Sequence, residues 1–142
     1  MKAQNTVKFT FPARSVNEGF ARSAVAAFAA QVDPLLNEIA DIKTAVSEAV
    51  TNCIVHAYPD EMGVITLTAS LYEDNRLVLV IADKGCGIPN IAKAMEPLFT
   101  TGGIERAGLG FAVMESFMDT VRVRSTQGKG TRVTLIKQLG RR

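Results

Sequence analysis

The 142-residue sequence predicts an α+β protein, a two-layer sandwich of the type with helices on one face of a mixed, mostly antiparallel sheet. Two observations predict this fold. Hydrophobic and polar residues alternate in segments near both ends of the chain, as in half-buried strands. Hydrophobic residues recur at helical spacing in other segments, and the resulting element order, β-α-α-β-β-loop-α-β-β, is typical of helices segregated to one face of a sheet.

Composition favours a single domain spanning residues 1–142. Hydrophobic residues make up 47% of the chain and charged residues 21%, and the formal net charge is only +2. That charge is too small to predict a surface for nucleic acid, so no direct nucleic-acid partner is expected. No apolar run approaches the roughly 20 residues of a membrane-spanning helix, and no export signal opens the chain. No membrane partner is therefore expected, and the cytoplasm is the expected compartment.

The first elements are a strand and a helix. Residues 7–11 alternate hydrophobic and polar side chains, which predicts a short strand. Ser15 and Glu18 then fit a capping box at a helix N-terminus. Hydrophobic side chains recur at helical spacing after them, so a helix is expected from about residue 16 to 32.

A second helix is expected to follow at once. Asp33 predicts a cap, and Pro34 the first helical position. An apolar stripe over residues 39–53 marks the buried side of this helix. Because the residue before a proline is pushed out of helical geometry, the helix should end near Ala57, ahead of Pro59.

A hairpin begins the second half of the chain. Alternation over residues 65–71 predicts a half-buried strand, and the turn at 73–76 leads into a strand at 77–82. The second strand is apolar at every position, so we expect a central strand that is covered on both faces or partly occluded by a ligand.

A long glycine-rich loop separates this hairpin from the last elements. Residues 84–109 predict a functional loop with at most a short helix near 91–95. A helix at 111–118 and two strands are expected after it, the strands centred on 121–123 and 133–135 and joined across 127–130.

Polar residues on the second helix are the first candidates for chemistry. Glu48 and Asn52 lie four residues apart and share one helix face, which His56 continues. Taken alone, such a pair is explained best as a solvated helix face. Asp83, Gly85 and Gly87 directly follow the most apolar strand. A carboxylate beside two glycines at a strand end favours a binding cleft, although a simple turn has the same composition.

The glycines at 108 and 110 are expected to open the helix at Phe111, where backbone N–H groups at the positive helix end can meet phosphate oxygens. Common nucleotide motifs are absent. Neither this glycine pair nor the pair at 85 and 87 completes the GxGxxG of a Rossmann fold. The turn at residues 128–131 lacks the GK[ST] ending of a P-loop, and the HRD and DFG strings of ordinary protein kinases are missing.

Together these motifs resemble the N, G1, G2 and G3 boxes of the Bergerat-fold ATPases. This GHKL superfamily includes gyrases, MutL proteins, heat-shock chaperones and histidine kinases. The resemblance covers the whole chain, with Gly130 and Thr131 as its last motif. Three longer strings are similar to those of the anti-sigma-F factors of spore-forming bacteria: residues 48–52 with 56–58, residues 97–101, and residues 108–119.

The resemblance implies an ATP-dependent protein serine kinase that also binds and inhibits a sporulation sigma factor. Its phosphoryl acceptor would be a serine of an anti-anti-sigma antagonist, which phosphorylation inactivates. ATP or ADP and Mg²⁺ would be its cofactors, and the protein would form a homodimer. Two alternatives stay open: a general-stress anti-sigma kinase of the same family, and a regulator that binds nucleotide only to switch partners. A histidine-kinase fragment is disfavoured, because no helical phosphoacceptor region precedes the domain.

The family motifs assign roles to the matched residues. Asp83 would accept a hydrogen bond from the exocyclic amine of adenine, and Thr131 would support that contact directly or through water. Asn52 would give Mg²⁺ a neutral oxygen ligand, since the phosphates supply most of the charge. Glu48, one helical turn away, would take the proton from the attacking serine hydroxyl.

The glycine-rich part of the site supplies the remaining candidates. Gly108 and Gly110 would donate backbone N–H groups to the phosphates. Arg106, expected in the mobile loop just before them, would neutralise charge that develops on the transferred phosphoryl group. The residues expected to contact nucleotide in this part are Gly85, Gly87, Thr100, Thr101, Gly108 and Gly110.

Arg22 is the candidate for binding a partner protein. It lies one step from the apolar stripe of the first helix, so its long side chain can reach solvent at the border. An arginine at such a border is usually only solvated, but it is also a common binding hot spot. We expect Arg22 to contact the sigma factor, the antagonist, or both.

Overall fold

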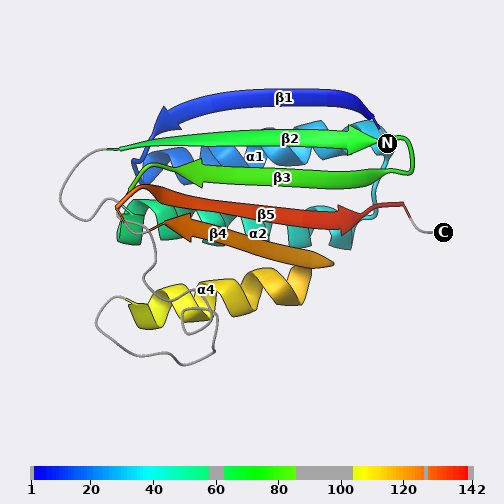
Figure 1. Cartoon of the computed structure of the whole chain (residues 1–142). Helices are drawn as coiled ribbons and strands as arrows, with labels where there is room; N and C mark the ends of the chain where they lie inside the picture. The colour runs from blue at the N-terminus through cyan, green and yellow to red at the C-terminus, as the bar shows by residue number, and fades with distance from the viewer. Residues whose placement is uncertain (1, 58–62, 86–103, 127, 141–142) are drawn as a thin grey trace.

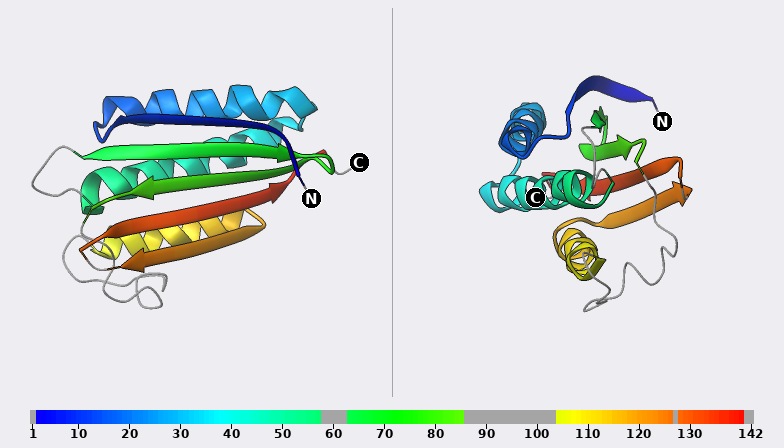
Figure 2. Two further views of the ribbon diagram at one scale, coloured as in Figure 1. Left: turned by 45° about the horizontal axis from the view of Figure 1, so that its top comes forward. Right: turned by 90° about the vertical axis from the view of Figure 1, so that its left-hand side faces the viewer.

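The computed structural model of the protein describes residues 2–57, 63–85, 104–126 and 128–140. Five strands form one sheet in the order β1-β2-β3-β5-β4, and the helices of the described part cover one face of it (Figures 1 and 2). The predicted two-layer α+β sandwich is confirmed. All the strand pairings in these residues are antiparallel, so the expected mixed sheet is wrong in that detail.

The elements follow the predicted order along the chain. The strands are β1 (Ala3–Pro12), β2 (Val64–Tyr72), β3 (Arg76–Asp83), β4 (Thr120–Thr126) and β5 (Gly130–Gln138). The helices are α1 (Val16–Ala29), α2 (Leu36–Asn52) and α4 (Ile104–Phe117), with a 3-10 turn η1 (Ala30–Val32) and a π turn η2 (Cys53–Ala57). The short helix expected near 91–95 lies outside the described residues.

The predicted capping box at the start of α1 is wrong. Ser15 already has helical backbone angles (φ −57°, ψ −32°), and its side chain makes no capping hydrogen bond. Glu18 instead accepts a hydrogen bond from Arg22 at 2.8 Å, one helical turn further on. The predicted helix over 16–32 is otherwise confirmed, with η1 as its tightened last turn.

The second helix begins two residues later than predicted. Asp33 takes a left-handed conformation (φ 51°) and ends η1, while Leu35 is extended and caps α2. The Glu38 carboxylate accepts the Leu35 backbone N–H at 2.7 Å, which is the carboxylate half of a capping box. A leucine side chain cannot supply the other half. Helical winding persists through η2 to Ala57, as predicted, but with π geometry over its last five residues.

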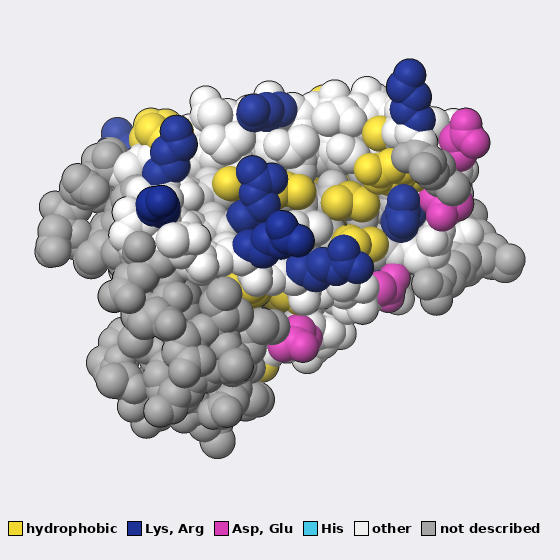
Figure 3. Space-filling view, in the orientation of Figure 1, with side chains coloured by type: hydrophobic (Ala, Val, Ile, Leu, Met, Phe, Trp, Pro, Cys, Tyr) yellow, Lys and Arg dark blue, Asp and Glu magenta, His cyan; other side chains and the backbone are white. Residues whose placement is uncertain are grey.

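The hydrophobic core lies between the helices and the inner face of the sheet. Alternate residues of β3 point into it and are buried, whereas the others, including Val78 and Val80, are only half-buried. The strand is central, as predicted, but the described residues cover only one of its faces. The open face carries many Lys and Arg side chains (Figure 3). On the strands these are Lys8, Arg76, Arg122, Arg124 and Arg132.

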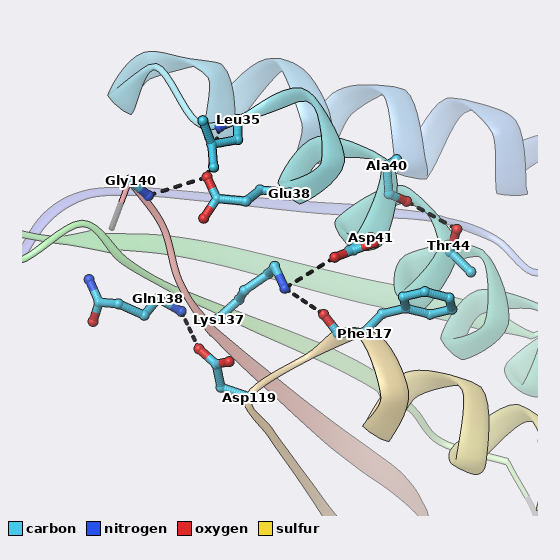
Figure 4. Close-up of polar contacts among 10 residues, drawn as sticks. All are labelled: Leu35, Glu38, Ala40, Asp41, Thr44, Phe117, Asp119, Lys137, Gln138 and Gly140. Carbon is cyan, nitrogen blue, oxygen red and sulfur yellow. Dashed lines mark hydrogen bonds and ion pairs between the residues drawn. The ribbon is translucent and has the colours of Figure 1, made fainter. Parts of the chain in front are cut away.

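The last helix, α4, begins at Ile104 rather than at Phe111. It contains both Gly108 and Gly110, each of which costs a helix roughly 1 kcal/mol, and the good helix formers at residues 105–107 and 109 favour the helix against that cost. Lys137 of β5 fixes the other end of α4. Its Nζ donates to the Phe117 carbonyl at 2.6 Å and lies 3.5 Å from an Asp41 carboxylate oxygen of α2 (Figure 4). No helix among the described residues is long and apolar enough to cross a membrane.

Candidate functional site

The candidate site lies at one end of the sheet, where β3 and α2 finish and β5 begins (Figure 1). Glu48 and Asn52 occupy the last turns of α2, four residues apart on one face, and both are half-buried. Their predicted shared face is confirmed. His56 falls within η2, whose π winding departs from the α-helical spacing on which its predicted position depends, and its side chain lies outside the described residues.

The side-chain amide of Asn52 is the unusual feature of this helix. Both its nitrogen and its oxygen are buried, and neither has a hydrogen-bond partner among the described residues. Buried amides in proteins are almost always hydrogen-bonded, so this one calls for a ligand. Its neutral oxygen suits a hard cation such as Mg²⁺, which takes oxygen ligands and is bound mainly through few protein groups and substrate phosphates. The described residues hold no cluster of three acidic, His or Cys side chains that would form a protein-only metal site.

The Asp83 carboxylate lies at the end of β3 and accepts three hydrogen bonds. It is buried, with 9% of the residue exposed. Its Oδ1 accepts the backbone N–H groups of Gly85 at 2.9 Å and Thr131 at 3.2 Å. Its Oδ2 lies 3.4 Å from the Cys53 sulfur, which donates to it. Burial raises the pKa of Asp83 above its ordinary value, and the three hydrogen bonds oppose that rise.

Gly130 allows β5 to pass close to the end of β3. Its φ is +120°, and a Cβ atom at this position would lie 2.2 Å from the Asp83 carbonyl oxygen. Only glycine fits such an approach. The next residue, Thr131, faces Asp83 across the strand pair, and its hydroxyl lies 2.8 Å from that of Ser125. Thr131 thus contacts Asp83 through its backbone N–H, while its support of an adenine contact stays a prediction.

The glycines expected to open the last helix are not at its start. Gly108 and Gly110 lie inside α4, so their N–H groups are not the free donors of a helix N-terminus. Arg106, which we expected in a loop, lies in the first turn of the same helix. Gly85 lies two residues after the end of β3 and is buried. Gly87, Thr100 and Thr101 lie outside the described residues.

Two further candidates are placed by the structure. Arg22 of α1 is partly exposed and bonded to Glu18, at the helix border where the sequence predicts it.

Cys53, the residue after Asn52, was not singled out by the sequence. Its thiol contacts Asp83 from an element 30 residues away, a pairing that no local pattern reveals.

Comparison with known proteins identifies the class of this fold and site. The model of the histidine kinase-like ATPase domain matches residues 11–137, so the site defined by Asn52 and Asp83 lies in such a domain. The crystal structure of the RsbU and RsbW domains of a Mycobacterium tuberculosis protein has the same fold, with a TM-score of 0.72. It is 23% identical and covers 98% of this chain and 34% of that chain.

Two curated relatives place the chain more closely. The anti-sigma F factor of Caldanaerobacter subterraneus is 55% identical over 99% of both chains. That of Clostridium acetobutylicum is 52% identical, over 95% of this chain and 94% of the relative. The chain belongs to the anti-sigma F factor family.

Proposed function

We propose that this protein is an ATP-dependent serine kinase and anti-sigma factor. It binds and inhibits a sporulation sigma factor, and it phosphorylates and inactivates an anti-anti-sigma antagonist on a serine. The histidine kinase-like ATPase domain implies nucleotide binding, and the relatives named anti-sigma F factor support a sigma factor as one partner. We further propose a homodimer as the working form.

One observation carries the nucleotide part of this proposal. The buried Asn52 amide at the end of α2 has no hydrogen-bond partner among the described residues, and the residue that follows it contacts the Asp83 carboxylate. This arrangement supports a single site in which Asn52 would hold the cation and Asp83 would bind the purine. Mg²⁺ held by the Asn52 oxygen would neutralise phosphate charge, and Asp83 would accept the exocyclic amine of adenine. Guanine has a carbonyl at that position, so it would be repelled.

Glu48 is the proposed general base. It lies one helical turn before Asn52 on the same face, so its carboxylate would lie near the phosphates that share Mg²⁺ with Asn52. It would take the proton from the serine hydroxyl as the hydroxyl oxygen attacks the γ-phosphorus, and the bond from that phosphorus to the ADP oxygen breaks. Arg106, in the first turn of α4, would balance the charge that develops on the transferred phosphoryl group.

A single-turnover experiment tests this function. Purified protein with Mg²⁺ and γ-labelled ATP should transfer phosphate to a serine of the purified antagonist. Glu48→Gln keeps the shape of the side chain but removes its basicity, so transfer should slow by about 10²- to 10⁴-fold while ATP still binds. Transfer at the parental rate in this variant would remove Glu48 from the mechanism. No transfer by the parent protein, with ATP binding intact, would support a nucleotide-switched binding module instead.

A further inference from the structure

The Cys53 thiol forms a polar contact between η2 and Asp83 at the end of β3. Its Sγ lies 3.4 Å from Asp83 Oδ2, and both residues are buried. The thiol carries the hydrogen, so it donates and the carboxylate accepts. Burial raises the pKa of the Cys53 thiol, and the nearby negative charge of Asp83 raises it further. The 3.4 Å contact makes the Cys53 thiol a hydrogen-bond donor to Asp83.

The two oxygens of Asp83 have different surroundings. Oδ1 already accepts two backbone N–H groups, those of Gly85 and Thr131. Oδ2 accepts only the Cys53 thiol among the described residues. Each carboxylate oxygen can accept about two hydrogen bonds, so Oδ2 is the atom with a position left for a ligand donor. The thiol thus bonds to the same oxygen that would receive the adenine amine.

We propose that Cys53 is a specificity-determining positioning residue, whose thiol holds Asp83 Oδ2 in the orientation that accepts the exocyclic amine of adenine. This inference rests on the proposed nucleotide-binding function. Without a donor at residue 53, the carboxylate keeps only the two bonds to Oδ1, about which its plane can turn. Recognition of the adenine amine then weakens, whereas contacts with ribose and phosphates do not change.

Inosine triphosphate separates this role from ordinary packing, because it carries a carbonyl where ATP carries the amine. Cys53→Ala should weaken ATP binding by about three- to tenfold, the size of one hydrogen bond, and leave the affinity for inosine triphosphate within about twofold. Cys53→Ser restores a donor, so it should keep the parental preference for ATP. Val50→Ala, which deletes buried methyl groups from α2 without removing a hydrogen bond to Asp83, serves as the packing control. Val50→Ala should lower the affinities for ATP and inosine triphosphate by the same factor, or leave both unchanged.

The outcomes are distinguishable by titration calorimetry with Mg²⁺ present. If the parent binds ATP no better than inosine triphosphate, the proposed adenine contact fails, and the role of Cys53 fails with it. Two outcomes would overturn only the role of Cys53. In the first, the parent prefers ATP over inosine triphosphate and Cys53→Ala keeps that preference. In the second, Cys53→Ser loses the preference for ATP just as Cys53→Ala does. Should Cys53→Ala not fold, Cys53→Val fills the space without a donor and carries the same expectation.

Discussion

The backbone N–H of Thr131 donates to Asp83 Oδ1 at 3.2 Å, joining two residues that are 48 positions apart in the sequence. They face each other across the β3–β5 pair, at the C-terminal end of β3. The neighbouring strand therefore holds the carboxylate side chain in place through its main chain. Substitution of the Thr131 side chain would leave this bond intact, so the position of Oδ1 depends on the register of the two strands.

Asp83→Asn should weaken ATP binding by about 10- to 150-fold, the effect of losing a hydrogen bond to a charged acceptor, about 1.5 to 3 kcal/mol. The asparagine oxygen can still accept the N–H groups of Gly85 and Thr131, so the fold should persist. Its NH₂ group then replaces Oδ2 and presents a donor to the adenine amine. Calorimetry measures the change.

Asp74→Asn is the matched control, because Asp74 is an exposed carboxylate in the turn at the opposite end of β3. It removes the same charge, and ATP affinity should stay parental. Equal affinities for the parent and Asp83→Asn would rule out Asp83 as the adenine contact.

The pKa of Asp83 gives a pH dependence with a definite sign. Burial raises this pKa, so protonation begins above the pH at which an ordinary aspartate gains its proton. Protonation removes the negative charge and turns one carboxylate oxygen into an O–H donor, which weakens acceptance of the adenine amine. The affinity for adenine nucleotide should therefore fall as the pH drops through the raised pKa. The phosphates also titrate on acidification, so the ratio of ATP to inosine triphosphate affinity is the quantity to measure. If that ratio did not change with pH in the parent, or fell equally in Asp83→Asn, the dependence could not be assigned to this group.

Asn52→Ala should separate stability from ligand binding. The Asn52 amide has no partner among the described residues, so its removal should lower the free energy of unfolding by less than about 0.5 kcal/mol, or raise it. Binding of MgATP should nevertheless weaken at least tenfold, about 1.4 kcal/mol. Urea unfolding and calorimetry give the two quantities.

Glu38→Ala provides the contrast. The buried Glu38 carboxylate accepts the N–H groups of Leu35 and Gly140, so its loss should cost about 1 to 3 kcal/mol of stability and leave nucleotide affinity unchanged. A large loss of stability in Asn52→Ala would show that its amide has a structural partner, against the proposed ligand role.

Gly130→Ala should destabilise the fold by about 3 kcal/mol or more. The added Cβ would lie 2.2 Å from the Asp83 carbonyl oxygen, which is backbone and cannot rotate away, and φ is +120°. Gly128 is a control in the same turn: its φ is +81°, and a Cβ there meets nothing within 4 Å. Gly128→Ala should therefore cost only about 1 to 2 kcal/mol, the ordinary penalty for a left-handed conformation. Similar unfolding midpoints for the two variants would argue against the close approach at Gly130.

The strands and most helix ends could be predicted because each depends on local periodicity or on a proline. The start of α2 could not, since the choice between Pro34 and Leu36 was decided by the Glu38 carboxylate reaching the Leu35 N–H. The start of α4 was mispredicted because Gly108 and Gly110 were interpreted as a helix opening. In the site, the motifs located Glu48, Asn52 and Asp83. They did not reveal Cys53, because its contact with Asp83 joins residues 30 positions apart in the sequence.

Arg22→Ala tests the proposed partner surface on α1. Arg22 forms an i,i+4 ion pair with Glu18 at 2.8 Å, and its side chain is 42% exposed. Exposed pairs of this kind contribute about 0.3 to 0.5 kcal/mol, so the variant should fold and bind ATP like the parent. Binding of the sigma factor or the antagonist should weaken by more than about 1 kcal/mol, which is roughly fivefold.

Glu18→Gln is the control that breaks the ion pair but keeps the guanidinium. If Arg22 itself contacts a partner, Glu18→Gln should retain binding. If both variants lose binding equally, the partner recognises the ion pair or the helix, and if neither does, the partner surface lies elsewhere.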